Sequence, residues 1–91
     1  MEMTANNWEV YIIQTRSGKL YTGITKDIER RFKEHREQGK GARFFKISEP
    51  EKIVFREKQL NRSEATKREI SIKKMNRQQK IELIEHQTHE N

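Results

Sequence analysis

The sequence predicts a small α+β domain in which a three-stranded antiparallel sheet is flanked by helices, in the order β-β-α-β-α-α. Two short β-branched and aromatic runs, over residues 8–15 and 19–24, flank a tight turn at residues 16–18, as in a hairpin. A third alternating run, KIVFRE, follows at residues 52–57. Helical segments lie between and after these strands, which is typical of a sheet covered by helices.

The length of the hairpin loop decides which side chains share a face of the sheet. A three-residue loop, with Gly18 in the left-handed conformation, aligns Ile13 with Tyr21. Tyr11 then lies opposite Gly23, and both tyrosines point to one face. A two-residue Ser-Gly loop would place the tyrosines on opposite faces, and turn chemistry alone does not choose between the two loops.

Three helices are predicted from their starts and ends. The first runs from about Asp27 to Glu37, with Thr25 or Asp27 as its cap. The second lies within residues 61–75, and a short final helix spans about residues 78–85. Between the first helix and the third strand, a glycine-flanked basic stretch is typical of a loop.

Length and composition indicate one domain with a basic surface. The 91 residues divide into a flexible N-terminus at 1–7, a folded domain at 8–86 and a flexible tail at 87–91. Only 31% of the residues are apolar, so most of them must serve one small core. The net charge of +6 favours a polyanionic partner, although a basic protein without such a partner has the same composition.

Several classes are excluded or disfavoured by what the chain lacks. With no cysteine, it can form neither a disulfide framework nor a thiolate zinc site. No signal peptide and no run of transmembrane length is visible, so we expect a cytoplasmic protein that does not associate with membranes.

Two candidate groups lie on the predicted first helix, close to the hairpin. Ile28 and Phe32 are one turn apart and mark its buried stripe. Arg31 and His35 are also one turn apart, on the shoulder of that stripe, and could reach a cleft beside the sheet. Gly23, without a side chain, would leave room for a ligand there. Taken singly, a solvated arginine and a half-buried histidine are the more ordinary outcomes.

Glu69 stands out as the single acid among the charged residues of 67–80. At helical spacing it falls in one row with Ala65 and Ile72, so a carboxylate interrupts an inward-facing stripe. A buried carboxylate needs a cation or strong hydrogen bonds. The alternatives are a salt bridge to Lys73 one turn later, or an exposed Glu69 if Ile70 marks the buried face.

The ordered set VYII, YTG, ITKDIERRFKEH and EATKREISIKK resembles the GIY-YIG nuclease superfamily, most closely its small stand-alone bacterial members. The likeness extends from about Glu9 to Leu83. It implies a three-stranded sheet with helices and the hairpin register that brings the tyrosines together. The matching positions are Tyr11, Tyr21, Gly23, Arg31, His35 and Glu69.

The chain departs from the superfamily pattern at a few positions. Glu9 and Val10 replace the glycine and isoleucine of the first motif, and Thr22 replaces the isoleucine of the second. Asn76 lies near a late asparagine that some branches use, but its spacing differs, so no role is carried over to it.

The resemblance implies an endonuclease that hydrolyses phosphodiester bonds in DNA with Mg²⁺ or Mn²⁺. On this interpretation Glu69 holds the metal ion, and Tyr11, or a water that it positions, is the general base. Arg31 offsets charge on the phosphoryl oxygens. Tyr21 orients substrate or water, and His35 assists in proton transfer or contacts a phosphate.

The same interpretation predicts a set of residues that contact the nucleic acid, including basic side chains that follow its backbone. Phe44 and Phe45 could stack on unpaired bases or pack in the core. An unknown protein partner could supply target specificity. The alternative functions are a nucleic-acid-binding module that does not cut and, less favoured, a protein-interaction adaptor. The predicted contact residues are Gly23, Lys26, Arg30, Lys40, Arg43, Lys46, Lys73 and Lys74.

Overall fold

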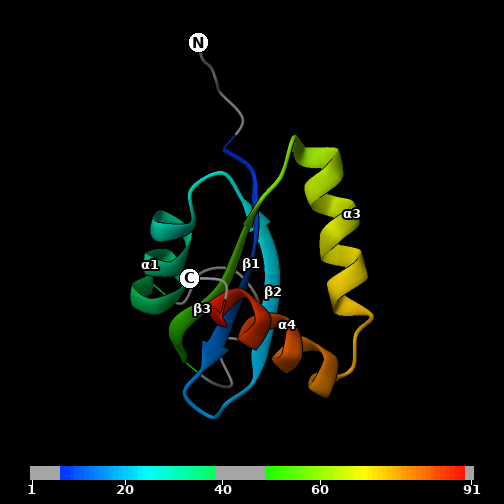
Figure 1. Ribbon diagram of the computed structural model, residues 1–91. Helices are drawn as coiled ribbons and strands as arrows, with labels where there is room; N and C mark the ends of the chain where they lie inside the picture. The colour runs from blue at the N-terminus through cyan, green and yellow to red at the C-terminus, as the bar shows by residue number, and fades with distance from the viewer. Residues whose placement is uncertain (1–6, 39–48, 90–91) are drawn as a thin grey trace.

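The computed structural model describes residues 7–38 and 49–89. Within these residues the chain forms a three-stranded antiparallel sheet with helices on both of its faces, as Figure 1 shows. The α+β fold predicted from the sequence is therefore confirmed, in the order β-β-α-β-α-α. The elements are β1 (Glu9–Thr15), β2 (Leu20–Thr25), α1 (Ile28–Gln38), β3 (Pro50–Lys58), α3 (Arg62–Lys73) and α4 (Arg77–His89).

The sheet has the order β2-β1-β3, so β1 is central and antiparallel to both neighbours. The β1–β2 hairpin uses the three-residue loop, because the N–H of Thr15 donates to the C=O of Lys19 at 2.8 Å. Gly18 adopts a φ of 91°, the left-handed conformation that this loop requires. Tyr11 consequently faces Gly23 across the strands, and the register that unites the two tyrosines on one face is confirmed.

One face of the sheet is covered by α1. Tyr11, Ile13 and Ile28 are buried there, with Phe32 and Ile53 packed against them. The spacing of Ile28 and Phe32 along α1 places both on the side that meets the sheet. This apolar cluster is small, and both tyrosines belong to it.

The opposite face is covered by α3 and α4. Val10 and Ile12 alternate with Tyr11 and Ile13 along β1 and therefore point to this side. The cluster is larger than the one under α1. Its buried members are Val10, Ile12, Phe55, Ala65 and Ile72, and Trp8, Leu20, Ile24, Val54, Met75, Leu83 and Ile84 pack around them.

The turn from β2 into α1 is fixed by two short side chains. The hydroxyl of Thr25 accepts the N–H of Asp27 at 3.1 Å, and the Asp27 carboxylate accepts the N–H of Arg30 at 3.1 Å. Both residues that the sequence offered as caps thus take part, with Asp27 satisfying an amide of the first helical turn.

An ion-pair network ties α1 to the sheet. Arg56 on β3 donates from Nε and Nη2 to the Glu9 carboxylate, both at 2.9 Å, and from Nη1 to Glu29 on α1 at 2.7 Å. Glu9 is buried, so the paired geometry compensates its desolvation. Glu9, which stands where the superfamily motif has glycine, therefore has a structural use in this chain.

Helix α4 continues to His89, past the end predicted at residue 85. Gln87, which the sequence assigned to the flexible tail at 87–91, is part of this helix. Its side-chain amide accepts the N–H of Arg56 at 3.2 Å and donates to the C=O of Arg56 at 2.6 Å. These contacts with β3 explain why the helix extends further than its apolar spacing indicated. Among the described residues, no helix has the length and apolar character needed to cross a membrane.

Candidate active site

The site is built around Tyr11, at the centre of the sheet face that α1 covers. Its side chain is 2% exposed, and its hydroxyl lies over Gly23 on β2. A Cβ at position 23 would come within 2.5 Å of the Tyr11 oxygen, closer than a Cβ can approach. Glycine is therefore required here, because the Tyr11 hydroxyl occupies the space that a Cβ would need.

Tyr21 and His35 extend the site on the same face. The rings of Tyr11 and Tyr21 have centroids 6.4 Å apart, and the Tyr21 and His35 rings meet edge to face at 6.0 Å. His35 is 3% exposed. The histidine on α1 thus lies against Tyr21 rather than at the surface.

Arg31 and Glu69 both lie close enough to Tyr11 to act on its ionisation. The pKa of Tyr11 is raised far above its ordinary value, chiefly because burial disfavours the phenolate. The charges of Tyr21 and Glu69 raise this pKa further, whereas the charge of Arg31 lowers it. Residues from β2, α1 and α3 therefore converge electrostatically on one hydroxyl.

Glu69 projects from α3 on the side that meets the sheet. Its neighbours in the helical row, Ala65 and Ile72, are fully buried, whereas Ile70 is 48% exposed. The Glu69 side chain is 19% exposed and pairs with Lys73 at 3.2 Å. The row predicted from the sequence is therefore observed, and the salt bridge offered as an alternative is present as well.

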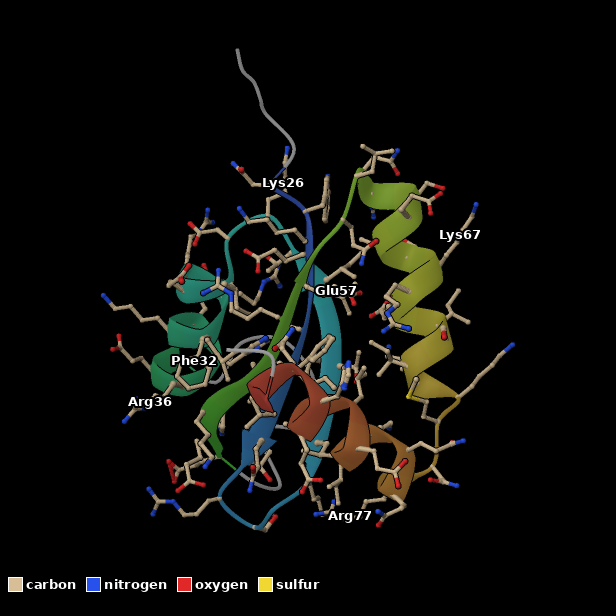
Figure 2. All side chains as sticks on the ribbon, viewed as in Figure 1. Lys26, Phe32, Arg36, Glu57, Lys67 and Arg77 are labelled. Carbon is tan, nitrogen blue, oxygen red and sulfur yellow. The ribbon has the colours of Figure 1, made fainter. Side chains whose placement is uncertain are left out.

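The outer face of α3 provides a contrast. Lys67, labelled in Figure 2, points away from the sheet and pairs with Glu64 at 3.4 Å. Both side chains are largely exposed, at 71% and 47%. The same helix thus carries one carboxylate in solvent and another, Glu69, on the side that meets the sheet.

The donor set suits a metal that needs few protein ligands. Among the described residues, no three His, Cys, Asp or Glu side chains come together as a metal-binding group. Glu69 is a carboxylate whose charge raises the pKa of Tyr11. Mg²⁺ commonly binds through one or two carboxylates and completes its shell with water and substrate phosphate. A single inward Glu69 fits that ion, and it would not suit a metal that requires a closed protein cage.

The predicted nucleic-acid contacts have different surroundings. Lys26 and Arg30 are exposed beside Arg31, at the start of α1. Lys73 pairs with Glu69, and Lys74 is exposed at the carboxyl end of α3. The remaining members of the set, and the two phenylalanines proposed for stacking, fall outside the described residues: Lys40, Arg43, Phe44, Phe45 and Lys46.

A cleft next to Arg31 contains residues that the sequence analysis did not select. It has a volume of about 320 Å³ and lies between the β2–α1 turn and the start of α3. The missing signal was the strand register: Trp8 precedes β1 and Lys26 follows β2, one step beyond the Glu9–Thr25 pair. Its charged and aromatic lining consists of Trp8, Lys26, Asp27, Arg30, Arg31 and Arg62.

Comparisons with known proteins show the family to which the chain belongs. The sequence model of the GIY-YIG catalytic domain matches residues 7–82. The UPF0213 protein DP2720 of Desulfotalea psychrophila is 47% identical over 77 residues, covering 85% of this chain and 70% of the relative. The UPF0213 protein plu4503 of Photorhabdus laumondii is 43% identical over 82 residues, covering 90% and 78%.

A solved structure shares the fold. The solution NMR structure of the UPF0213 protein BH0048 from Bacillus halodurans superposes with a TM-score of 0.55 at 33% identity, covering 86% of this chain and 82% of that one. The matched family model spans the sheet, α1, α3 and the first part of α4. The chain therefore belongs to the GIY-YIG catalytic-domain family.

Proposed function

We propose that this GIY-YIG domain is a divalent-metal-dependent endonuclease that hydrolyses phosphodiester bonds in DNA. The observation that supports the proposal is the arrangement around Tyr11 within a GIY-YIG catalytic domain: its hydroxyl lies over Gly23, and its ring is 6.4 Å from that of Tyr21. The charges of Arg31 and Glu69 also act on the pKa of Tyr11. A titratable group whose pKa is strongly shifted, with charges of both signs beside it, is typical of catalytic sites.

Glu69 is the residue that would hold the metal ion, Mg²⁺ or Mn²⁺. When bound, the ion supplies Lewis-acid stabilisation of charge on the phosphate and the leaving oxygen. Lys73 neutralises Glu69 in the free protein, and its exposed ammonium on a flexible stem can move to solvent or to a substrate phosphate.

Tyr11 receives the proton of the attacking water. The phenol is neutral at pH 7 even at its ordinary pKa of about 10, and the raised pKa of Tyr11 makes the phenolate that can act as the base rarer still in the free protein. Arg31 opposes the rise in pKa and favours that phenolate. The oxygen of the water adds to phosphorus, the bond to the leaving oxygen breaks, and this oxygen takes a proton from solvent.

Arg31 and Tyr21 act on the phosphate and the substrate. The exposed Arg31 guanidinium offsets the charge that develops on the phosphoryl oxygens. Tyr21 orients the substrate or the attacking water, and His35 fixes the Tyr21 ring through their edge-to-face contact. His35 thus supports the reaction as a positioning residue.

The test is a cleavage assay on flapped, branched and plain DNA and on RNA, with Mg²⁺, Mn²⁺ or a chelator. We expect chelation to abolish cleavage and Glu69→Gln to reduce it about a hundredfold or more, because metal stabilisation contributes several kcal/mol. Glu64→Gln is the matched control, since it removes a carboxylate from the solvent face of the same helix. It should cleave within about twofold of wild type.

Two results would contradict the proposal. Cleavage by Glu69→Gln at the wild-type rate would exclude the metal role of this residue. Binding of nucleic acid without cleavage of any substrate, with or without metal, would instead establish the alternative, a binding module that retains the fold.

A further inference from the structure

The cleft beside the proposed catalytic face contains the only tryptophan of the chain. The C=O of Trp8 accepts the N–H of Gln59 at 2.9 Å, so the backbone is fixed just before β1 begins. The side chain is half-buried: it packs against the apolar cluster under α3 and also lines the cleft. The indole therefore forms one wall of this cleft.

Two cations from different elements lie over this ring. The Lys26 ammonium is 5.8 Å from the ring centroid, and the Arg62 guanidinium carbon is 5.7 Å from it. Lys26 follows β2 and Arg62 is the first residue of α3. Figure 2 shows Lys26 at the end of the molecule where α3 starts.

One of the proposed catalytic residues, Arg31, lines this cleft. Arg30 adds a further cation, and Asp27 is the acid among the lining residues. A nucleic acid strand whose phosphate reaches Arg31 therefore has its adjacent nucleotide at the cleft.

We propose that the Trp8 cleft is a subsite for an unpaired nucleotide adjacent to the scissile phosphate. The base stacks on the indole, and the flanking phosphates bind Lys26 and Arg62. This inference rests on the proposed function, because it takes a nucleic acid strand as the substrate. Phosphate binding alone needs cations but no aromatic wall, whereas base stacking needs the wall and uses any base.

Because Lys26 lies over the Trp8 ring in the free protein, it must move before a base can stack there. Its flexible stem lets it leave when a base arrives. Its ammonium then meets the phosphate of the incoming nucleotide. A paired base inside a duplex cannot reach the ring, so the subsite selects flaps, frayed ends and single strands.

Intrinsic fluorescence reports on the subsite directly, since Trp8 is the only tryptophan. The full-length protein is titrated with a chelator present, so that no cleavage occurs, using oligothymidylate, an all-abasic oligomer of equal length and a blunt duplex. We expect oligothymidylate to quench Trp8 and to bind about tenfold more tightly than the abasic oligomer, as stacking of a base predicts. Oligouridylate in the same titration compares RNA with DNA.

Variants separate stacking from structural support. Trp8→Leu keeps apolar volume and should lose about tenfold in affinity for oligothymidylate, measured by fluorescence anisotropy of a labelled strand. Trp8→Phe retains a ring and should lose less than about threefold. Neither variant should change affinity for the abasic oligomer or the duplex. Thermal unfolding of both variants verifies that each is folded at the assay temperature.

Equal affinity of the wild-type protein for oligothymidylate and the abasic oligomer would overturn the proposal. So would a Trp8→Leu loss of the same size for all three probes, which would identify Trp8 as a purely structural residue. If Trp8→Leu does not fold, the comparison of wild type with Trp8→Phe on the three probes still decides. A failure of the nuclease proposal is seen separately, as absence of cleavage with metal, and leaves these metal-free measurements unaffected.

Discussion

The two faces of the sheet are built from the same strand but for different purposes. On the α3–α4 side, Val10 and Ile12 meet a broad apolar cluster from both helices. On the α1 side, Tyr11 and Ile13 meet a smaller cluster in which polar groups are interspersed. Alternation along β1 thus separates a face with the larger apolar cluster from the face on which the proposed catalytic tyrosines lie.

The second face compensates for its small core with directed polar contacts. Arg56 joins Glu9 and Glu29, and thereby fixes α1 against the sheet. Arg31 and His35 are carried by this same helix. The face under α1 is therefore positioned by ion pairs and by the close approach of Tyr11 to Gly23, whereas the opposite face is positioned by apolar burial.

The largest effects test the apolar contribution of each face. Ile12 and Ile13 are both fully buried and adjacent on β1. Replacing either by alanine should lower the free energy of unfolding by about 2–5 kcal/mol, measured by urea denaturation. Cleavage by the folded protein should fall only for Ile13→Ala, because Ile13 is paired with Tyr21 across the hairpin. Equal activity of the two variants would remove the functional distinction between the faces.

A smaller loss of stability is expected when the ion pairs between Arg56 and its two glutamates are removed. Arg56→Ala leaves the Glu9 carboxylate buried without this partner, and should lower the free energy of unfolding by about 1–2 kcal/mol. The Arg56 side chain is 43% exposed, so this is less than a fully buried pair would lose. Glu29→Gln removes only the exposed ion pair with Arg56 and should lower the free energy of unfolding by less. If both variants have the unfolding free energy of the wild type, the ion pairs of Arg56 do not stabilise this face.

Gly23→Ala tests the close approach between β2 and the tyrosine. The new Cβ would collide with the Tyr11 ring, which must shift away from its position. We expect cleavage to fall about tenfold, or about 1.4 kcal/mol in activation free energy, while the unfolding midpoint falls only modestly. Full activity together with an unchanged midpoint would show that the Tyr11 position is not critical.

The smallest effect concerns the pH dependence of stability. The pKa of Tyr11 is higher in the folded protein than in the unfolded chain, where it is about 10. Above about pH 10 the unfolded state therefore loses this proton first, and stability falls as pH rises. Tyr11→Phe should reduce that fall in urea denaturation at alkaline pH.

Glu69→Gln provides a second readout of the same ionisation. Glu69 contributes to the raised pKa of Tyr11, so its neutralisation should lower that pKa. The ultraviolet absorbance of tyrosinate measures this, with Tyr21→Phe as the common background so that one tyrosine titrates. An unchanged titration curve would place Glu69 too far from Tyr11 for the proposed site.

Local sequence signals predicted the strands, the helix starts and the row that contains Glu69. They did not choose between the two hairpin loops, because Ser-Gly fits both, and only the paired strands exclude the shorter one. They also placed the end of α4 too early, because the contact of Gln87 with β3 joins residues 31 positions apart. Tertiary contacts, not propensity, set both features.

The Trp8 cleft was missed for a related reason. Its walls come from the residue before β1, the β2–α1 turn and the first residue of α3, and no periodic pattern links these segments. The family resemblance did not include Trp8 or Arg62 either. Once a hairpin register is known, however, the positions just outside its strand ends can be read as neighbours.

The amide of Gln87 has a consequence for association between molecules. β3 is an outer strand of the sheet, and Gln87 occupies both the N–H and the C=O of Arg56 on it. An incoming strand from another copy would need these same two groups to extend the ladder. The Gln87 side chain therefore interrupts the row of free backbone groups that another strand would need along the outer edge of β3.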